Sequence, residues 1–478
     1  MDSKPLRFPL LLAASLLTAV AYWNGTGLQP RWPLTWLAAM PVLLVAPRAP
    51  AWTALGAAFS AFALGALNTW SYLALLPLPV HLAMIFLPSL AFGLGVLAHR
   101  FFLRRRQLWP ALLALPAIWT SYVYLLSLSS PHGTFGALAY TQADCLPILQ
   151  LAALGGIWPI EFLLLFIPTA VAVAVGAGVP RREKIRMEAA VSAVVGAALI
   201  YGFFRLGAPP EGRPMSVGLI ASDQPENLRT AESLPLLHRY LAQVPALAQA
   251  GARIVVLPEH LVRMADGENA GPVDLLLADA AVANKTGIVV GLDHIAGAGS
   301  AWNEARYYPP EKGPVATYTK HHLLPGLEGG FQPGRSLVGF SQDGVRFGLA
   351  ICKDLDFRAP AADYGRLRIN CLIVPAFDFS VDAWLHSRIA MVRGVESGYP
   401  IIRVAKLGAL TVSDDRGRVR AEVRSAAAPF ASLVAPIPGR SERTFYGRFG
   451  DWFAWLSVAA ACALIIRLIR ASLGTAAR

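Results

Sequence analysis

Long, nearly uncharged apolar runs fill the first 207 residues of the chain and recur once near its end. A helix that crosses the hydrocarbon core of a bilayer needs about 20 mostly apolar residues. The pattern therefore predicts eight membrane-spanning helices, of which the second is short for a bilayer. We expect these spans at Phe8–Tyr22, Trp32–Val45, Trp52–Leu76, Val80–Leu97, Leu108–Leu128, within Ile148–Val175, within Ala189–Phe204, and at Trp452–Ile469.

The first apolar run has a second interpretation, as a cleavable signal peptide. Lys4 and Arg7 precede it, and Ala19-Val20-Ala21 resembles a cleavage site. Because further apolar runs follow at once, we expect a retained membrane anchor instead.

The pattern changes between residues 208 and 450, where short apolar runs alternate with helical patterns and with turns rich in glycine and proline. Short runs rich in valine and isoleucine are typical of buried strands, so this region reads as an α/β domain. The sequence thus predicts a transmembrane domain at 1–207, an α/β domain at 208–450, and an eighth transmembrane helix with a tail at 451–478. The expected strands are Val217–Ala221, Ile254–Leu257, Ile288–Leu292, Arg346–Ile351, Leu372–Val374 and Ile401–Ala405, and the expected helices are Ser233–Gln249, Val273–Asn284 and Trp384–Glu396.

Composition agrees with this division of the chain. Of the 478 residues, 55% are hydrophobic, above the 45–50% that is usual for soluble proteins. The net charge is +12, yet residues 208–450 hold 26 basic and 24 acidic side chains, so most of the excess lies between the apolar runs. A nucleic-acid-binding protein would carry that excess on its folded domain, so we expect no nucleic-acid partner.

The placement of the basic residues predicts the orientation of the chain in the membrane. Lysine and arginine follow the second, fourth, sixth and eighth apolar runs, whereas the loops after the third and fifth runs contain neither. Arg31 and Arg205 are single exceptions. Because cytoplasmic loops are enriched in lysine and arginine, the α/β domain is expected on the outer face of the membrane.

Three reactive residues each follow an apolar run in the α/β domain: Glu259, Lys320 and Cys352. A cysteine acts as a nucleophile when it is a thiolate, so it needs a base or a positive neighbour. A carboxylate in apolar surroundings can be that base, and a lysine can stabilise an oxyanion. Each residue alone has an ordinary explanation, as a buried cysteine or a solvated charge. Together they indicate an activated thiol nucleophile.

The remaining cysteines and the adjacent histidines do not indicate a metal site. The spacings of the four cysteines match no zinc or CxxC pattern, and Cys371 and Cys462 lie in apolar runs typical of packing residues. A disulfide between Cys352 and Cys371 remains an alternative. His321 and His322 face opposite ways on an extended segment, so we expect no metal there.

The Glu259, Lys320 and Cys352 positions match the Glu-Lys-Cys triad of the nitrilase superfamily. Over nearly its full length the chain resembles the membrane-bound branch of that superfamily, the apolipoprotein N-acyltransferase family. Further similarities are the lysine motif Tyr318-x-Lys320-x-His322-Leu323-x-Pro325, Glu328 at the position of a second functional glutamate, Trp302-Asn303 in place of a Tyr-Asn pair, Asp382-Ala383-Trp384 after the nucleophile, and the arrangement of eight spans.

The resemblance implies a multi-span α-helical membrane domain and a nitrilase-like α-β-β-α sandwich. It implies that Cys352 takes a fatty acyl chain from a membrane phospholipid and passes it to the terminal amine of a diacylglyceryl-cysteine lipoprotein. Glu259 would act as the base and Lys320 as the oxyanion stabiliser, with Glu328, Asp354, Asn303 and Trp384 binding substrate or supporting the site. It further implies a monomer in the bacterial cytoplasmic membrane that uses no metal or organic cofactor.

The sequence departs from the family pattern beside the nucleophile. Cys352-Lys353-Asp354 replaces the usual Cys-Tyr-Glu, and the turn Phe331–Gly334 is closer to that of soluble nitrilase relatives. These departures leave two alternatives open: a membrane-tethered amidase or hydrolase that uses water as the acceptor, and a non-enzymatic relative that binds lipoproteins.

Overall fold

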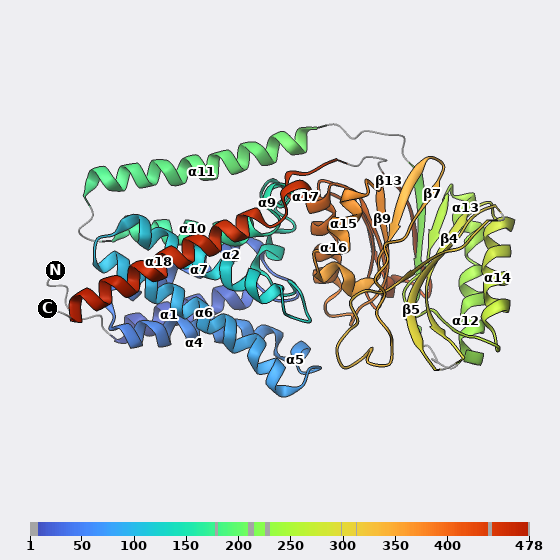
Figure 1. Ribbon diagram of the computed structural model, residues 1–478, viewed down its shortest axis with the longest axis horizontal. Coiled ribbons are helices and arrows are strands. Elements are labelled where there is room, and N and C mark those ends of the chain that lie inside the picture. The colour runs from blue at the N-terminus through green and yellow to red at the C-terminus, as the bar shows by residue number, and fades with distance from the viewer. Residues whose placement is uncertain are drawn as a thin grey trace. The chain divides into compact units, whose positions relative to one another are not determined.

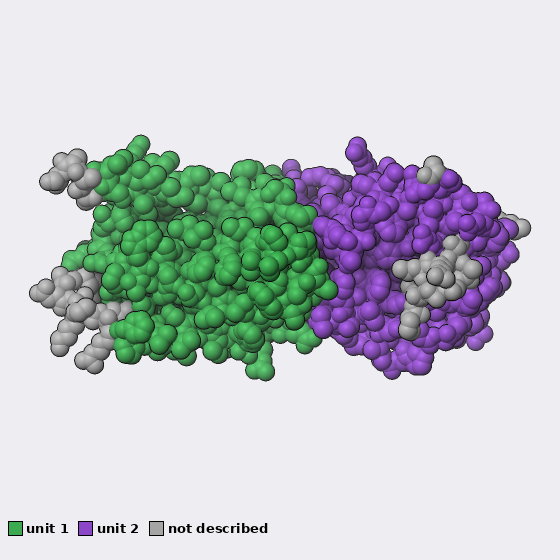
Figure 2. Space-filling model, turned by 90° about the horizontal axis from the view of Figure 1, so that it is seen from below, with its two compact units in different colours: residues 1–206, 449–478 green, residues 207–448 purple. Residues whose placement is uncertain are grey.

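The computed structural model describes residues 8–176, 180–208, 215–224, 230–297, 299–311, 313–437 and 442–476 (Figure 1). The chain forms two compact units, shown in different colours in Figure 2. One unit comprises Met1–Leu206 with Phe449–Arg478, and the other comprises Gly207–Arg448.

The first unit is built from helices. Within the described residues, seven of them are long and apolar enough to cross a membrane, by length and composition. These are α1 (Phe8–Gly25), α4 continued by α5 (Ala51–Ala66 and Trp70–Leu73), α6 (Leu78–Arg104), α7 (Leu108–Ser127), α10 (Trp158–Val175), α11 (Arg181–Gly207) and α18 (Trp452–Ala476). The shorter helices are α2 (Trp32–Ala38), α3 (Met40–Val45), α8 (Leu146–Leu149) and α9 (Ala152–Gly155).

The second predicted span is the exception to the expected eight. Residues 32–45 form two helices of 7 and 6 residues, neither of which has membrane-spanning length. Pro41 stands in the first turn of α3 and has no N–H to continue the hydrogen bonds of α2, which explains the break. The described part of the first 207 residues therefore holds six helices of spanning length, not the seven that the sequence predicted.

One carboxylate lies in the interior of this helical unit. Glu161 on α10 is fully buried, and its oxygens accept hydrogen bonds from Trp119 Nε1 on α7 (2.8 Å) and from the backbone N–H of Ala139 (2.9 Å). An unpaired polar group in an apolar interior is costly. These hydrogen bonds therefore hold α7, α10 and the loop that carries Ala139 together.

The second unit is a sandwich of two sheets. The first sheet has the order β13-β1-β2-β4-β5-β6, with β3 also paired to β4, and the second has the order β12-β11-β10-β9-β8-β7. The strands of the first sheet are β1 (Met215–Ala221), β2 (Ile254–Val256), β3 (Val262–Ala265), β4 (Gly287–Ile295), β5 (Ala301–Tyr308), β6 (Ala316–Thr319) and β13 (Ala431–Ile437). Those of the second are β7 (Gly339–Gln342), β8 (Val345–Leu349), β9 (Cys371–Phe377), β10 (Ile401–Lys406), β11 (Ala409–Ser413) and β12 (Val419–Arg424).

Helices cover the outer face of each sheet (Figure 1). Helices α12 (Thr230–Leu241), α13 (Val244–Gln249) and α14 (Ala270–Ala283) pack on the first sheet, and α15 (Ala361–Arg366) and α16 (Ala383–Ser397) pack on the second. The short helix α17 (Phe445–Phe449) follows the last strand. The core between the sheets takes side chains from both, such as Val256 of β2 and Phe347 of β8. This is the predicted α-β-β-α sandwich, so the fold prediction is confirmed.

Candidate active site

The three residues of the predicted triad lie at the ends of strands. Glu259 follows β2, Lys320 follows β6, and Cys352 opens a 3₁₀ turn (Cys352–Asp356) shortly after β8. Two contacts with the end of β9 bring the sheets together there. Glu259 N–H faces the carbonyl oxygen of Ala376 at 3.4 Å, and Cys352 Sγ lies 3.6 Å from the carbonyl oxygen of Phe377. The candidate base Glu259 and the thiol of Cys352 are therefore neighbours across the two sheets.

The backbone at Cys352 is strained. Its φ is +39°, in the left-handed region that residues with a side chain rarely adopt. Such strain persists where the surroundings fix it, and it is common at catalytic residues. The sharp turn at the end of a buried strand removes Cys352 from the strand's regular alternation, so the candidate nucleophile lies at a corner of the fold.

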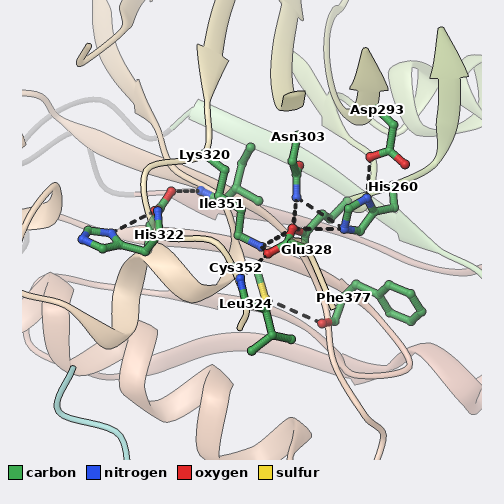
Figure 3. Close-up of polar contacts among 12 residues, drawn as sticks. His260, Asp293, Asn303, Lys320, His322, Leu324, Glu328, Ile351, Cys352 and Phe377 are labelled. Carbon is green, nitrogen blue, oxygen red and sulfur yellow. Dashed lines mark hydrogen bonds and ion pairs between the residues drawn. The ribbon is translucent and has the colours of Figure 1, made fainter. Parts of the chain in front are cut away.

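Lys320 is the centre of a buried charge cluster (Figure 3). Its Nζ lies 2.8 Å from Glu259 Oε1 and 2.9 Å from each carboxylate oxygen of Glu328. Burial alone would lower the pKa of Lys320, but the charges of Glu259 and Glu328 outweigh it and raise that pKa above its usual range. The lysine is therefore an ammonium ion at neutral pH.

Both oxygens of Glu328 are occupied by hydrogen-bond donors. Besides the two contacts with Lys320, Oε1 accepts from Asn303 Nδ2 (2.7 Å) and Oε2 accepts from the backbone N–H of Leu324 (2.6 Å). Burial would raise the pKa of Glu328, but the hydrogen bond from His260 and the charge of Lys320 hold it well below its usual range. Glu328 is thus a permanent counter-ion of Lys320.

Glu259 is arranged differently. Its Oε1 accepts from Lys320 and from Asn303 Nδ2 (2.7 Å), whereas its Oε2 receives no hydrogen bond from any residue that the structure describes. The side chain is nevertheless only 2% exposed. Of the two glutamates, Glu259 is therefore the one with an oxygen available to take a proton.

The thiol of Cys352 is protonated at rest. Burial and the nearby negative charge of Glu259 raise its pKa well above the usual value, and Lys320 and Arg403 only partly oppose them. A thiol in this state needs a base to become a nucleophile.

Asp354 is fully buried and joins the segment that carries Lys320 to the turn that begins at Cys352. Its Oδ2 accepts from Tyr318 OH (2.7 Å) and from the N–H of Ile351 (3.0 Å). Its Oδ1 accepts from the N–H groups of His321 (3.1 Å) and His322 (2.8 Å). The carboxylate therefore supports the backbone on both sides of the site.

Trp384 and Lys353 lie apart from this cluster. The ring of Trp384, on α16, lies 5.6 Å from the guanidinium carbon of Arg388, and no hydrogen bond links it to the triad among the described residues. Lys353 is buried, with its Nζ 3.3 Å from Asp356 Oδ2.

The structure adds two residues that the sequence analysis missed, His260 and Asp293. His260 Nδ1 lies 2.5 Å from Asp293 Oδ1, and its Nε2 lies 3.5 Å from Glu259 Oε1 and 3.6 Å from Glu328 Oε1. The sequence could have indicated these two residues only through their positions. His260 directly follows the candidate base, and Asp293 stands near the end of β4, the strand beside β2 in the sheet.

The acidic part of the cluster also has the geometry of a cation site. Ligand atoms of Glu259, His260 and Glu328 lie within 4.8 Å of one another. The ammonium group of Lys320 already bridges the two glutamates, so a metal ion would compete with a covalently tethered cation. The alternative of a disulfide between Cys352 and Cys371 is wrong, since both are free cysteines.

Comparison with protein families assigns both units. Residues 216–446 match the carbon-nitrogen hydrolase family model, so the second unit is a carbon-nitrogen hydrolase domain. Residues 10–170 match the model for the apolipoprotein N-acyltransferase N-terminal domain. With both parts present in one chain, the protein belongs to the apolipoprotein N-acyltransferase family.

Two named relatives agree with this assignment. The chain is 25% identical to the apolipoprotein N-acyltransferase of Geobacter metallireducens, over 73% of each chain. It is 27% identical to the one of Chromobacterium violaceum, over 96% of this chain and 93% of that one. A solved structure of an amidase from Nesterenkonia sp. AN1 is 17% identical with a TM-score of 0.42, covering 51% of this chain and 97% of that chain.

Proposed function

We propose that this protein moves a fatty acyl chain from a membrane phospholipid to the terminal amine of a diacylglyceryl-cysteine lipoprotein, through a thioester on Cys352. The observation that carries the proposal is the buried cluster in which Lys320 binds two glutamates while Glu259 keeps one oxygen free, beside a protonated thiol. The named relatives and the seven helices of membrane-spanning length support the choice of substrates.

In the first step Glu259 Oε2 takes the proton of the Cys352 thiol, and the thiolate attacks the ester carbonyl of the phospholipid. The ammonium of Lys320, with a backbone N–H beside Cys352, stabilises the oxyanion. When the tetrahedral intermediate collapses, the carbon–oxygen bond breaks, and the lyso-lipid oxygen leaves with the proton that Glu259 holds. The products are a thioester on Cys352 and a lyso-phospholipid.

In the second step the lipoprotein amine attacks the thioester carbonyl. Glu259 accepts the amine proton, the carbon–sulfur bond breaks, and Cys352 recovers a proton from Glu259 as the amide leaves. No metal or organic cofactor enters either step. Glu328 and Asn303 keep Lys320 and Glu259 in place, Asp354 supports the turn, and Trp384 contacts substrate.

We also propose that the protein is a monomer of the bacterial cytoplasmic membrane with its second unit on the outer face. Arginines follow α6, and further basic residues open α11, whereas the loops after α5 and α7 contain no lysine or arginine. With this orientation both α1 and α4 run outward, so α2 and α3 return the chain between them. The segment 32–45 would rise about 21 Å as a continuous helix, less than the hydrocarbon thickness, so the bilayer thins or neighbouring helices cover the segment there.

Mass spectrometry of the purified protein tests the proposal. The protein is incubated with a diacyl phospholipid and then with a diacylglyceryl-cysteine peptide. We expect an acyl adduct on Cys352 that moves to the peptide amine. Cys352→Ser should not support this transfer, whereas the matched control Cys462→Ser, an exposed cysteine on α18, should behave like the wild type.

The alternative outcomes have distinct meanings. Release of free fatty acid from the adduct, with no acylated peptide, would refute the transferase and favour a hydrolase that uses water as the acceptor. If neither adduct nor product forms, and wild type and Cys352→Ser are identical, the proposed chemistry is wrong.

A further inference from the structure

His260 and Asp293 have no part in the reaction as written above, yet both belong to the charge cluster. The backbone of His260 has φ +55°, a second left-handed residue in the site. Its imidazole is hydrogen-bonded to Asp293 at one nitrogen and faces Glu259 and Glu328 with the other (Figure 3). The side chain is 15% exposed, so the imidazole is largely withdrawn from solvent.

The surroundings of His260 contain more negative than positive charge. Three carboxylates and one ammonium group make up the ionic part, so a neutral imidazole would leave a net charge of −2 in a buried cluster. Protonated, it reduces that charge to −1. The groups that face His260 are Glu259 beside it, Asp293 on β4, Asn303 on β5, Glu328 with Lys320 behind it, and the rings of Phe331 and Phe377.

The charge state of His260 follows from this arrangement. Burial alone would lower its pKa, but the charges of Asp293 and Glu259 and the hydrogen bond to Asp293 outweigh it and raise the pKa to about 10. The imidazolium form is therefore the resting form at neutral pH. It is a second cation beside two glutamates whose charge Lys320 alone does not balance.

We propose that His260, held by Asp293, is a positioning residue for the base Glu259. The imidazolium shares the negative charge of the two glutamates with Lys320 and faces Glu259 Oε1, which leaves Oε2 to take the proton of the thiol. It also reduces the negative charge next to the oxyanion that forms on acylation. This inference rests on the proposed acyl transfer and adds a residue pair to it.

The test is the pH dependence of Cys352 acylation by a diacyl phospholipid in the full-length protein. A nearby positive charge typically lowers the pKa of a carboxylate by about one to three units. His260→Gln should therefore move the acid limb of the rate profile upward by about one pH unit. Acylation would then be about tenfold slower below the limb and recover above it.

Asp293→Asn tests the same cluster with the opposite sign and covers the case in which His260→Gln fails to fold. It removes a negative charge, while the imidazolium still faces Glu259 and Glu328, so the limb should move downward; an upward shift would overturn the proposal. In the double variant the imidazolium is absent as well, so the limb should lie above that of Asp293→Asn alone.

His294 is the matched control. It is the next residue on β4 and has an equivalent pairing, with Nε2 3.0 Å from Asp266 and Nδ1 3.4 Å from Glu304. Neither of these carboxylates belongs to the cluster, so His294→Gln should keep the wild-type limb. A rate that falls equally at every pH in His260→Gln, or an equal shift in His294→Gln, would overturn the proposal.

A second readout separates this inference from the proposed function. Alkylation of Cys352 by iodoacetamide also needs the thiol proton to leave, but needs no lipid or peptide. If the wild type forms no acyl adduct, the proposed function fails, and the pH limb of alkylation still decides the role of His260. An unshifted alkylation limb in both His260→Gln and Asp293→Asn would refute that role even where acyl transfer is established.

Discussion

Asp354→Asn is the substitution with the clearest structural consequence. The carboxylate of Asp354 accepts two donors at each oxygen, from Tyr318 and Ile351 at one and from His321 and His322 at the other. An asparagine amide replaces one of these oxygens by an NH₂ group. Turned toward His321 and His322, the NH₂ group faces two N–H donors. Turned toward Tyr318 and Ile351, it faces the N–H of Ile351, while the Tyr318 hydroxyl can rotate to accept from it, so at least one hydrogen bond is lost either way.

The magnitude follows from the hydrogen bonds that are lost. A hydrogen bond to a charged group contributes about 1.5–3 kcal/mol, so the loss of at least one lowers the unfolding free energy by at least about 1.5 kcal/mol. For a domain of this size, each kcal/mol lowers the thermal midpoint by about 2–4 °C. We therefore expect the midpoint of the second unit to fall by at least about 3 °C. Acylation of Cys352 should fall as well, because the segment that carries Lys320 loses hydrogen bonds that hold it in place.

Thermal unfolding followed by intrinsic fluorescence, in detergent, measures this change. Asp363→Asn is the matched control. Asp363 pairs with Arg366 at 2.6 Å, but the two side chains are 39% and 56% exposed. Such a surface pair contributes at most about 1 kcal/mol. A midpoint for Asp354→Asn within about 2 °C of the wild type would show that the carboxylate does not hold the two segments together.

Three further predictions concern the base and its neighbours. Glu259→Gln keeps the shape but not the base, so acylation should fall about 10²–10⁴-fold, and near-normal rates would assign the base elsewhere. In Gly291→Ala the new Cβ would lie 2.5 Å from the Cα of Glu259. We expect roughly 100-fold slower acylation, whereas Gly271→Ala, with open space around it, should match the wild type; equal rates would contradict this geometry. His260 binds a proton in the folded state up to about pH 10 but in the unfolded state only up to about pH 6.5, so wild-type stability should fall between these values as pH rises. That slope, at most about 1.4 kcal/mol per pH unit, should be reduced in His260→Gln, and thermal midpoints at pH 7 and 9 that differ equally in both proteins would exclude it.

The hydrophobic pattern predicts the strands that contain a short apolar run and misses those with polar residues along them. All six strands expected from apolar runs form, among them β1, β4 and β10. Strands such as β5 and β12 were not predicted, because polar residues interrupt or alternate along them. Strand β12, Val419–Arg424, alternates between exposed and partly buried positions at the edge of its sheet. Such a pattern depends on which neighbour covers the strand, which a single sequence does not state.

Individual residues of the site differ in the same way. Glu259, Lys320 and Cys352 could be placed because each follows an apolar run and because the family has a matching triad. His260 could not, since one histidine beside a glutamate has no spacing that defines a site. Its importance comes from Asp293, which lies 33 positions away in sequence and is its neighbour only once β2 and β4 pair. The break in the second predicted span has a local cause, Pro41, that hydropathy alone does not register.

The placement of the triad on two sheets links activity to the completion of folding. Glu259 and Lys320 follow strands of the first sheet, whereas Cys352 follows a strand of the second. Neither sheet alone holds both a thiol and a base to activate it. Under the proposed mechanism, a chain whose sheets have not yet closed on one another therefore carries a thiol without its base.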